Sequence, residues 1–342
     1  SNVSKIHEGA GVLVVRPGII KLPLLDYISL IFSHHNEIRQ QINEFKPDVI
    51  VGWSIINSYL AVRQARAKGI PFIYYWIDVL ERLIPFRPFK IIGKLVERQT
   101  LKRSDRILVI NDKLRDHTIQ LGASPERTLV LRAGIDTRQF DPGSNSRALS
   151  KQYGFNEKDI VLFFMGWLYH FSGLREVTHK LAEVDNSSLK LLIVGDGDDY
   201  EELQELREKY NLQDRVILAG KKPYQEIPGL IATADICLLP AYPWEPIMQD
   251  IVPIKMYEYM AMKKPVIATR LPGIMKEFGE DNGVVYVDRP EDVVAMAIEL
   301  VQNGSVETLG SKARHFAVRH SWDTITDEFE GILEEVSREK SS

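Results

Sequence analysis

The sequence predicts an α/β protein of two doubly wound domains, each with a parallel sheet that helices cover on both faces. Short, β-branched apolar runs alternate with helical stretches, and the alternation starts again after the Asp-Pro-Gly-Ser-Asn-Ser segment at 141–146. A chain of 342 residues is long enough for two such domains. Ligands of such sheets bind beyond the carboxyl ends of the strands, so those loops are where we seek a site.

The first half contains four predicted strands with helices between them. Lys46-Pro47-Asp48 is a turn signal, and Gly69 with Pro71 separates a helix from the next strand. Gly122 has the position of a helix C-terminal glycine. We expect strands at 49–51, 72–76, 106–110 and 128–132, and helices at 58–68, 89–103 and 112–121.

The second half repeats this scheme with six strands. The run from Ile160 to Tyr169 is the longest apolar stretch, and it contains Gly166, so we interpret it as a buried strand followed by a loop. We expect strands at 160–165, 189–194, 215–219, 236–239, 266–269 and 284–287.

Composition excludes several classes of protein. The one cysteine, Cys237, allows neither an internal disulfide nor a metal site built from cysteines, which fits a reducing cytosol. No run approaches the ~18 apolar residues of a membrane-spanning helix, and no signal peptide is visible. The chain starts at Ser1-Asn2 without a methionine, which indicates either residues left over from cloning or a trimmed start. We therefore expect a cytoplasmic protein.

The net charge of −4 conceals two halves of opposite sign. Residues 1–143 carry 21 Lys and Arg against 14 Asp and Glu, a net +7, whereas residues 144–342 carry 22 against 33, a net −11. Much of the positive excess lies on one predicted helix, where cations recur among apolar residues. That helix is either an ordinary solvated face or a surface for anionic lipid or a polyprenyl-phosphate acceptor. Nucleic acid is disfavoured because the whole chain is acidic and has no reader motif. The cations of this patch are Arg87, Lys90, Lys94 and Arg98.

Two loops of the second half contain candidate chemistry, and the first is Gly195-Asp196-Gly197. Its glycines allow a ligand close to the backbone, and the next helix offers its amino end to an anion. A tight strand-to-helix turn has the same residues, so both readings stand. Acidic residues at a helix start are ordinary capping partners, and we expect no metal site here.

The second candidate is the segment 250–261, DIVPIKMYEYMA, which precedes a strand. Pro253 fits the first turn of a helix, and Lys255 lies three residues before Glu258 on one helical face. A helix amino terminus binds phosphate well, and nearby carboxylates accept hydrogen bonds from sugar hydroxyls. A surface helix with a salt-bridged Lys and Glu would have the same spacing.

This segment resembles a known signature. Pro253-x-Lys255-x-x-Glu258-Tyr259-Met260-Ala261, leading into Lys264-Pro265-Val266-Ile267-Ala268-Thr269, is similar to the donor site of the retaining GT-B glycosyltransferases of family 4. Further blocks resemble that family in the same order: Arg132 to Asp136 with Phe140 and Pro142, Ile193 to Gly197, Leu271 to Gly273 with Glu277, and Ser321-Trp322.

The resemblance implies a GT-B fold, in which two Rossmann-like domains face a cleft and a last helix crosses back to the first domain. It divides the chain into an acceptor-side domain at 1–143, a nucleotide-sugar domain at 144–320, and the C-terminal helix at 321–342. Members of the family place a strand, a Gly-rich loop and a long helix before a segment like Gly11-Val12-Leu13-Val14-Val15. The first strand and its loop are therefore expected to be missing.

The family transfers a sugar from a nucleotide-sugar to an acceptor with retention of configuration, without an obligatory metal or other cofactor. By resemblance, Glu258 would bind the ribose hydroxyls and Gly166 would lie under the pyrophosphate. Asp250 would replace the first Glu of the E-x7-E pattern, which contacts the donor sugar, and Asp78 lies near the family's acceptor motif. With Lys255, these two Asp residues are the candidate catalytic residues. The remaining candidates for donor binding are Gly195, Lys221 and Tyr257.

The chain departs from the family at two cations. Relatives have Gly-Arg after the first strand of the second domain and then Lys-Gly, whereas this chain has Gly166-Trp167 and Ser172-Gly173. A departing nucleoside diphosphate needs preorganised positive partners. Lys255, one turn from Glu258, is the first candidate substitute. The next candidates are Lys221, Lys222, His170 and Arg175.

We therefore expect a glycosyltransferase that acts in the synthesis of a cell-surface glycan or glycolipid. We expect it in the cytoplasm, peripheral on the inner face of the membrane. One alternative is a non-catalytic relative that binds a nucleotide-sugar or a protein partner, because both cations are missing. Another is a GT-B nucleotide-sugar epimerase, which needs acid and base carboxylates and a histidine that the sequence does not supply in a recognisable set.

Overall fold

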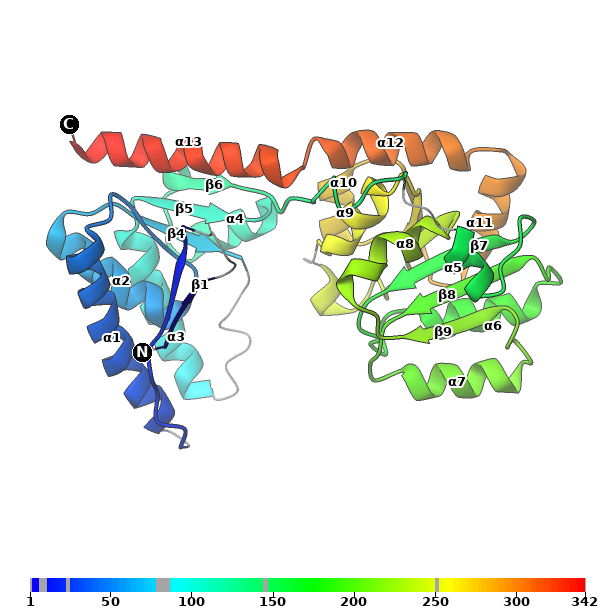
Figure 1. Cartoon of the computed structure of the whole chain (residues 1–342), viewed down its shortest axis with the longest axis horizontal. Coiled ribbons are helices and arrows are strands. Elements are labelled where there is room, and N and C mark those ends of the chain that lie inside the picture. Colours follow the sequence, from blue (N-terminus) through cyan, green and yellow to red (C-terminus); the bar gives the residue numbers. More distant parts are fainter. Residues whose placement is uncertain are drawn as a thin grey trace. The chain divides into compact units, whose positions relative to one another are not determined.

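The computed structural model describes residues 2–5, 11–22, 25–77, 87–143, 147–249 and 252–341. The chain divides into two compact units (Figure 1). The first unit comprises 1–132 and 326–342, and the second comprises 133–325, so the division falls earlier than the expected boundary at 143. The last helix, α13 (Trp322–Ser341), begins in the second unit and continues in the first.

The first unit contains a four-stranded parallel sheet in the order β3-β4-β5-β6. The antiparallel pair β1–β2 and the long helix α1 add to the predicted elements. The strands are β1 (Asn2–Lys5), β2 (Leu13–Arg16), β3 (Ile50–Gly52), β4 (Phe72–Trp76), β5 (Arg106–Val109) and β6 (Thr128–Val130). The helices are α1 (Leu25–Phe45), α2 (Ile55–Lys68), α3 (Arg87–Arg103) and α4 (Asp112–Gln120).

Both faces of this sheet are covered. Alternate residues of β4, including Phe72 and Trp76, join a core with Leu101 of α3. The opposite face meets α13, where the ring of Tyr75 lies 6.2 Å from that of Phe329. Figure 1 shows α13 on the other side of the sheet from α1, α2 and α3. This strand therefore has apolar residues at successive positions because each face packs against helices.

The second unit contains a six-stranded parallel sheet in the order β12-β11-β10-β7-β8-β9. All six predicted strands are present, and β9 is shifted by one residue. The strands are β7 (Ile160–Met165), β8 (Leu189–Val194), β9 (Val216–Gly220), β10 (Ile236–Leu239), β11 (Val266–Thr269) and β12 (Val284–Val287). The helices are α5 (Arg147–Gln152), α6 (Leu174–Glu183), α7 (Tyr200–Lys209), α8 (Ile227–Ala232), α9 (Ile254–Ala261), α10 (Pro272–Phe278), α11 (Asp292–Gln302) and α12 (Val306–Val318).

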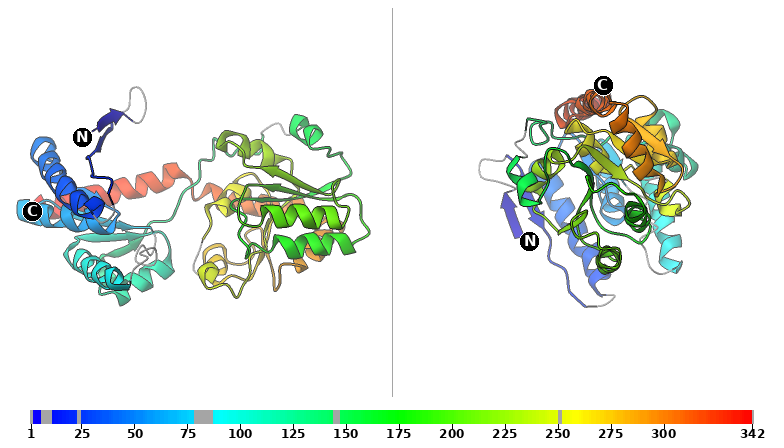
Figure 2. Two further views of the ribbon diagram at one scale, coloured as in Figure 1. Left: turned by 90° about the horizontal axis from the view of Figure 1, so that it is seen from below. Right: turned by 90° about the vertical axis from the view of Figure 1, so that its right-hand side faces the viewer.

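Helices lie on both faces of the second sheet as well (Figure 2). Phe163 and Met165 of β7 belong to one core, together with residues of α9 and α12. Leu162 and Phe164 belong to another core, with residues of α6 and α11. This two-sided burial explains the continuous apolar runs in the sequence.

Two of the sequence blocks meet in the second unit. The backbone N–H of Ile135 donates to the carbonyl of His320 at 2.9 Å, and the N–H of Trp322 donates to the carbonyl of Ile135 at 3.0 Å. The Trp322 indole covers Gly134, where a Cβ would lie 2.8 Å from Cδ2 of that ring. The glycine of one block is thus required by the tryptophan of the other.

Candidate functional site

The candidate site lies at the carboxyl ends of β7, β8 and β9. A glycine with positive φ follows β7 and β8 and ends β9: φ is +135° at Gly166, +148° at Gly195 and +66° at Gly220. The N–H of Gly195 donates to the carbonyl of Gly220 at 3.0 Å, and a Cβ on Gly195 would collide with the carbonyl oxygen of Gly166. Close packing of the loop backbones therefore explains Gly195 without a ligand, which supports the tight-turn reading.

Lys255 reaches this edge from the first turn of α9. Its Nζ lies over Gly166, where it would collide with any Cβ. The same ammonium lies 4.4 Å from the centre of the Phe164 ring, within the range of a cation–π contact. The two observations place a positive charge at the point where the first strand of this unit ends.

Burial lowers the pKa of Lys255 to about 8, and the negative charge of Glu258 opposes this effect. With that pKa, the protonated form exceeds the neutral form roughly tenfold at pH 7. Among the described residues, no acidic side chain forms an ion pair with this ammonium. The charge is therefore available to an anion that enters the site.

Glu258, one turn further along α9, is buried and held by a tyrosine. The hydroxyl of Tyr224 donates to Oε1 of Glu258 at 2.8 Å. The ring of Tyr224 packs edge-on against Phe140, with 5.8 Å between ring centres. Burial raises the pKa of Glu258, while the Tyr224 hydrogen bond and the charge of Lys255 lower it. Sequence reasoning missed Tyr224, whose one local signal is its place four residues after the glycine that ends β9.

Tyr257 lies in the core, which corrects the expectation that it contacts the donor. Its hydroxyl donates to Oε1 of Glu277 at 2.5 Å. Its ring lies 5.0 Å from that of Phe278 and 5.6 Å from that of His320. Only 1% of the residue is exposed, so α10 and α12 enclose the side chain. Its hydrogen bond ties α9 to the block at 271–277.

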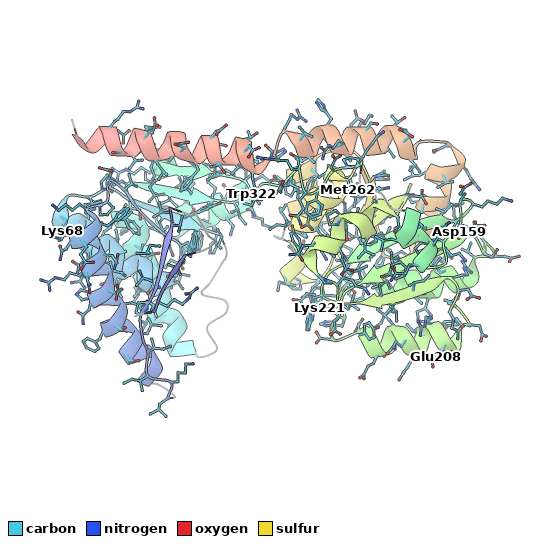
Figure 3. The ribbon with its side chains drawn as sticks, in the orientation of Figure 1. Lys68, Asp159, Glu208, Lys221, Met262 and Trp322 are labelled. Carbon is cyan, nitrogen blue, oxygen red and sulfur yellow. The ribbon has the colours of Figure 1, made fainter. Side chains whose placement is uncertain are left out.

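The other candidate cations, named after Lys255, differ in their partners and in their exposure. Arg175 is committed to Asp199, to which its Nε donates at 2.7 Å, and this hydrogen bond raises the pKa of the guanidinium. It is therefore not available to a diphosphate, contrary to expectation. Lys221 is exposed after β9, as Figure 3 shows, and His170 is exposed in the loop after β7. Lys222 is partly buried.

Several predicted residues lie outside the described part of the chain. Asp250 and Asp78 are among them. On α3, the side chains of Arg87 and Lys90 are likewise outside it. The other two cations of that patch, Lys94 and Arg98, are exposed beside apolar side chains of the same helix. Those exposed apolar residues are Ile91, Ile92 and Leu95.

The described residues contain neither a membrane-spanning helix nor a cluster of metal ligands. Within the ranges given above, no helix combines the length and the apolar character needed to cross a membrane. In the same ranges, His, Cys, Asp and Glu side chains form no group of three suited to a metal ion.

The site therefore combines three chemical features. The ammonium of Lys255 can pair with phosphate oxygens, and the carboxylate of Glu258 can accept hydrogen bonds from a diol. The glycine at 166 leaves room for the Lys255 ammonium next to the backbone. Such a set suits a nucleoside diphosphate, in which a ribose diol and phosphates lie on one molecule.

Comparisons with known proteins identify the family of the chain. The chain matches the family model Glycosyltransferase Family 4 over residues 3–139 and the model Glycosyl transferases group 1 over residues 145–316. The alpha-D-kanosaminyltransferase of Streptomyces kanamyceticus is 24% identical over 258 residues, which cover 72% of this chain and 64% of that protein. The chain thus spans less than two thirds of this relative's length.

Solved structures share the fold. Anabaena HepE in complex with UDP has a TM-score of 0.71 and 20% identity, over 93% of this chain and 85% of that chain. WaaG, a glycosyltransferase involved in lipopolysaccharide biosynthesis, has a TM-score of 0.65 and 19% identity, over 93% and 86%. At such identities the likeness shows the fold alone, which is GT-B with two Rossmann-like domains. With both halves matched by family models, the chain belongs to the GT-B glycosyltransferases of family 4.

Proposed function

We propose that this chain is a retaining glycosyltransferase that moves a sugar from a nucleotide-sugar donor to a glycan, glycolipid or polyprenyl-linked acceptor in cell-surface glycoconjugate synthesis. The observation that supports this most directly is the ammonium of Lys255 over Gly166, one turn from the buried carboxylate of Glu258. One solved structure of this fold was determined in complex with UDP, which makes UDP the first nucleotide to test.

Catalysis would come from stabilisation of the charge on the leaving diphosphate and from orientation of the donor and acceptor. Negative charge grows on the diphosphate as its bond to the sugar breaks, and a preorganised cation stabilises that charge. Lys255 takes this role in place of the missing Arg and Lys. Glu258, held by the hydroxyl of Tyr224, accepts hydrogen bonds from the ribose hydroxyls. The acceptor attacks from the face that the diphosphate leaves, so configuration is retained without a covalent enzyme intermediate or a metal.

A thermal-shift panel with UDP, GDP, ADP, CMP and TDP tests the donor site. We expect one nucleotide to raise the melting temperature of the full chain and Glu258→Ala to abolish that shift. Glu208→Ala is the control, since Glu208 is exposed on α7 (Figure 3). If no nucleotide stabilises the protein, the enzyme proposal fails and a non-catalytic relative is favoured.

Nucleotide-sugar turnover then separates the enzymatic alternatives. We expect transfer that releases the nucleoside diphosphate and that falls strongly in Lys255→Met. Conversion of the donor to its epimer, without transfer to an acceptor, would instead identify a nucleotide-sugar epimerase.

We also propose that the first unit associates peripherally with an anionic membrane surface through α3. Lys94 and Arg98 are exposed together with Ile91, Ile92 and Leu95. An amphipathic basic surface of this kind binds anionic lipid through apolar burial and charge attraction. Such binding would bring the enzyme to a lipid-linked acceptor at the cytoplasmic face.

A further inference from the structure

Aromatic side chains gather on two loops at the carboxyl edge of the second sheet. Trp167 and Tyr169, in the loop after β7, are 52% and 44% exposed, and Trp244, in the loop after β10, is 63% exposed. Soluble surfaces seldom expose such large apolar rings together unless they bind something. We call the set the aromatic strip, and its members are Trp167, Tyr169, Phe171, Tyr242 and Trp244.

The rings of the aromatic strip contact one another in sequence. Tyr169 stacks on Phe171 at 4.7 Å between ring centres and 8° between planes, and Trp167 lies 6.4 Å from Tyr169. On the other loop, Tyr242 stacks on Trp244 at 4.8 Å and 22°. Each loop thus presents a stacked pair of rings with an exposed tryptophan beside or within it.

Hydrogen bonds fix these loops before any ligand arrives. The N–H of Tyr242 donates to the carbonyl of Phe171 at 2.9 Å, which joins the two loops. The hydroxyl of Tyr242 donates to Oε1 of Glu176 on α6 at 2.6 Å. The N–H of Leu168 donates to the carbonyl of Asp196 at 3.0 Å, so the neighbouring loop after β8 holds the first loop from its other side. A preorganised surface loses little entropy when it binds a ligand.

The charge around the aromatic strip selects among possible ligands. The loops at 166–173, 195–199 and 240–249 contain no Lys or Arg, whereas they contain three Asp and one Glu. These loops therefore supply no cation to anionic lipid or nucleic acid. Aromatic faces pack against the C–H faces of pyranose rings, and carboxylates accept hydrogen bonds from sugar hydroxyls. A neutral saccharide satisfies both features.

We propose that the aromatic strip binds pyranose rings of a neutral oligosaccharide acceptor, and that Trp167 and Trp244 are its main stacking platforms. The proposal rests on the proposed function and names the acceptor class. Trp167 directly follows Gly166, over which the ammonium of Lys255 lies, so the aromatic strip begins at the candidate donor site. An acceptor chain stacked there would extend away from the reacting sugar.

Binding of defined hexasaccharides tests this proposal. Maltohexaose, cellohexaose and chitohexaose are titrated into the full chain by calorimetry, and we expect at least one to bind with a dissociation constant of about 1 mM or lower. Trp167→Ala and Trp244→Ala should each weaken that binding about fivefold or more, because a stacked aromatic ring contributes roughly 1 kcal/mol beyond its buried area. Trp244→Phe should retain most of it. Phe45→Ala, which removes an exposed ring on α1, is the matched control.

The nucleotide that stabilises the protein in the thermal-shift panel is titrated into the same variants. Unchanged nucleotide affinity in Trp167→Ala and Trp244→Ala, with saccharide binding lost, supports a saccharide surface. The proposal is overturned if none of the three hexasaccharides binds, if the Trp167→Ala/Trp244→Ala double variant binds them as the wild type does, or if the substitutions weaken nucleotide binding alone. Absence of nucleotide binding in the wild type counts against the proposed function, and the saccharide titration still decides the aromatic strip.

Discussion

Lys255 is the residue that we propose compensates for a lost motif. The chain has Trp167 and Ser172 where its family has cations, yet an ammonium still lies at the end of β7 because α9 supplies it. The Phe164 ring and the glycine backbone surround that ammonium, and burial lowers its pKa to about 8. A diphosphate would replace the hydration that burial removes, so the site is prepared for an anion.

The lowered pKa of Lys255 predicts how nucleotide binding depends on pH. We propose that the protonated amine binds the diphosphate. In the protein without ligand, this amine is protonated below about pH 8 and neutral above it. A terminal phosphate titrates near ~6 and contributes no change in the alkaline range. We therefore expect affinity to be level from pH 7 to 7.5 and to fall up to about tenfold per pH unit above 8. Calorimetric titrations across this range measure it, and Lys255→Met should lack the break.

Tyr224 predicts a second effect at the residue scale. Tyr224→Phe removes the hydroxyl that donates to Glu258 and leaves the ring contact with Phe140 in place. A hydrogen bond to a carboxylate in a partly exposed setting contributes about 1 kcal/mol, so nucleotide affinity should fall roughly fivefold. Tyr210→Phe is the control, since Tyr210 lies at the end of α7. Equal affinity in Tyr224→Phe and the wild type would show that Glu258 needs no support from this tyrosine.

The sequence predicted part of this site and could not predict the rest. Lys255 and Glu258 were proposed from the resemblance to the family's donor signature and from their spacing on one helix, which are both local information. Tyr224 and Glu258 are 34 residues apart, and Arg175 and Asp199 are 24 apart, so no local pattern shows either pair. Tyr257 was assigned to the donor side from its place in the motif, but its direction depends on α10 and α12, which pack around it.

The elements were predicted where burial leaves a clear pattern. Strands β7 to β12 contribute to cores on both faces of the sheet. Five of the six were predicted with the observed bounds, and β9 was predicted one residue early. The pair β1–β2 and helix α1 were not, because exposed apolar residues break their periodicity. Leu13 of β2 and Phe32 of α1 are examples of such residues.

The glycine row at the carboxyl ends of the strands predicts a stability effect. Gly195→Ala adds a Cβ that collides with the Gly166 carbonyl, at a residue whose φ is +148°. We expect a loss of about 2–4 kcal/mol in the free energy of unfolding, measured by urea denaturation. Gly304→Ala is the matched control, because its φ is +71° but no atom lies within 4 Å of the new Cβ. That variant should lose only about 1 kcal/mol, and equal losses would refute the role of the collision.

Helix α3 predicts salt-dependent binding to membranes. Lys94→Glu with Arg98→Glu reverses two exposed charges, each worth about 1 kcal/mol near an anionic surface. We expect flotation of the wild type with vesicles of phosphatidylcholine and phosphatidylglycerol at low salt, and a loss of roughly 30-fold or more in the variant. Lys158→Glu with Lys209→Glu, on the second unit, is the control for net charge. No flotation of the wild type at low salt would end the membrane proposal.

At the scale of the whole molecule, the net charge of −4 divides into a basic first half and an acidic second half. The acidic half contains the candidate diphosphate site, and that site depends on a local cation rather than on the charge of its domain. Its aromatic strip lies among acidic residues, which suits a neutral sugar. The exposed cations of α3 belong to the first unit, which suits an anionic surface. The acidic half thus matches a nucleotide-sugar and a neutral saccharide, and the basic first unit matches an anionic membrane surface.

We propose above all that Lys255 replaces the missing cations of the family. Calorimetric titration tests this proposal most directly. UDP, UMP and uridine are each titrated into the wild type, Lys255→Met and the control Lys209→Met. If the thermal-shift panel selects another base, the diphosphate, monophosphate and nucleoside of that base are used instead. We expect Lys255→Met to weaken diphosphate binding about 30-fold or more, as loss of a charge-assisted contact worth ~2 kcal/mol predicts, and to leave the nucleoside almost unaffected. Its thermal stability at pH 7 should not fall, because burial disfavours the charged lysine. Equal diphosphate affinity in the wild type and Lys255→Met would contradict the claim.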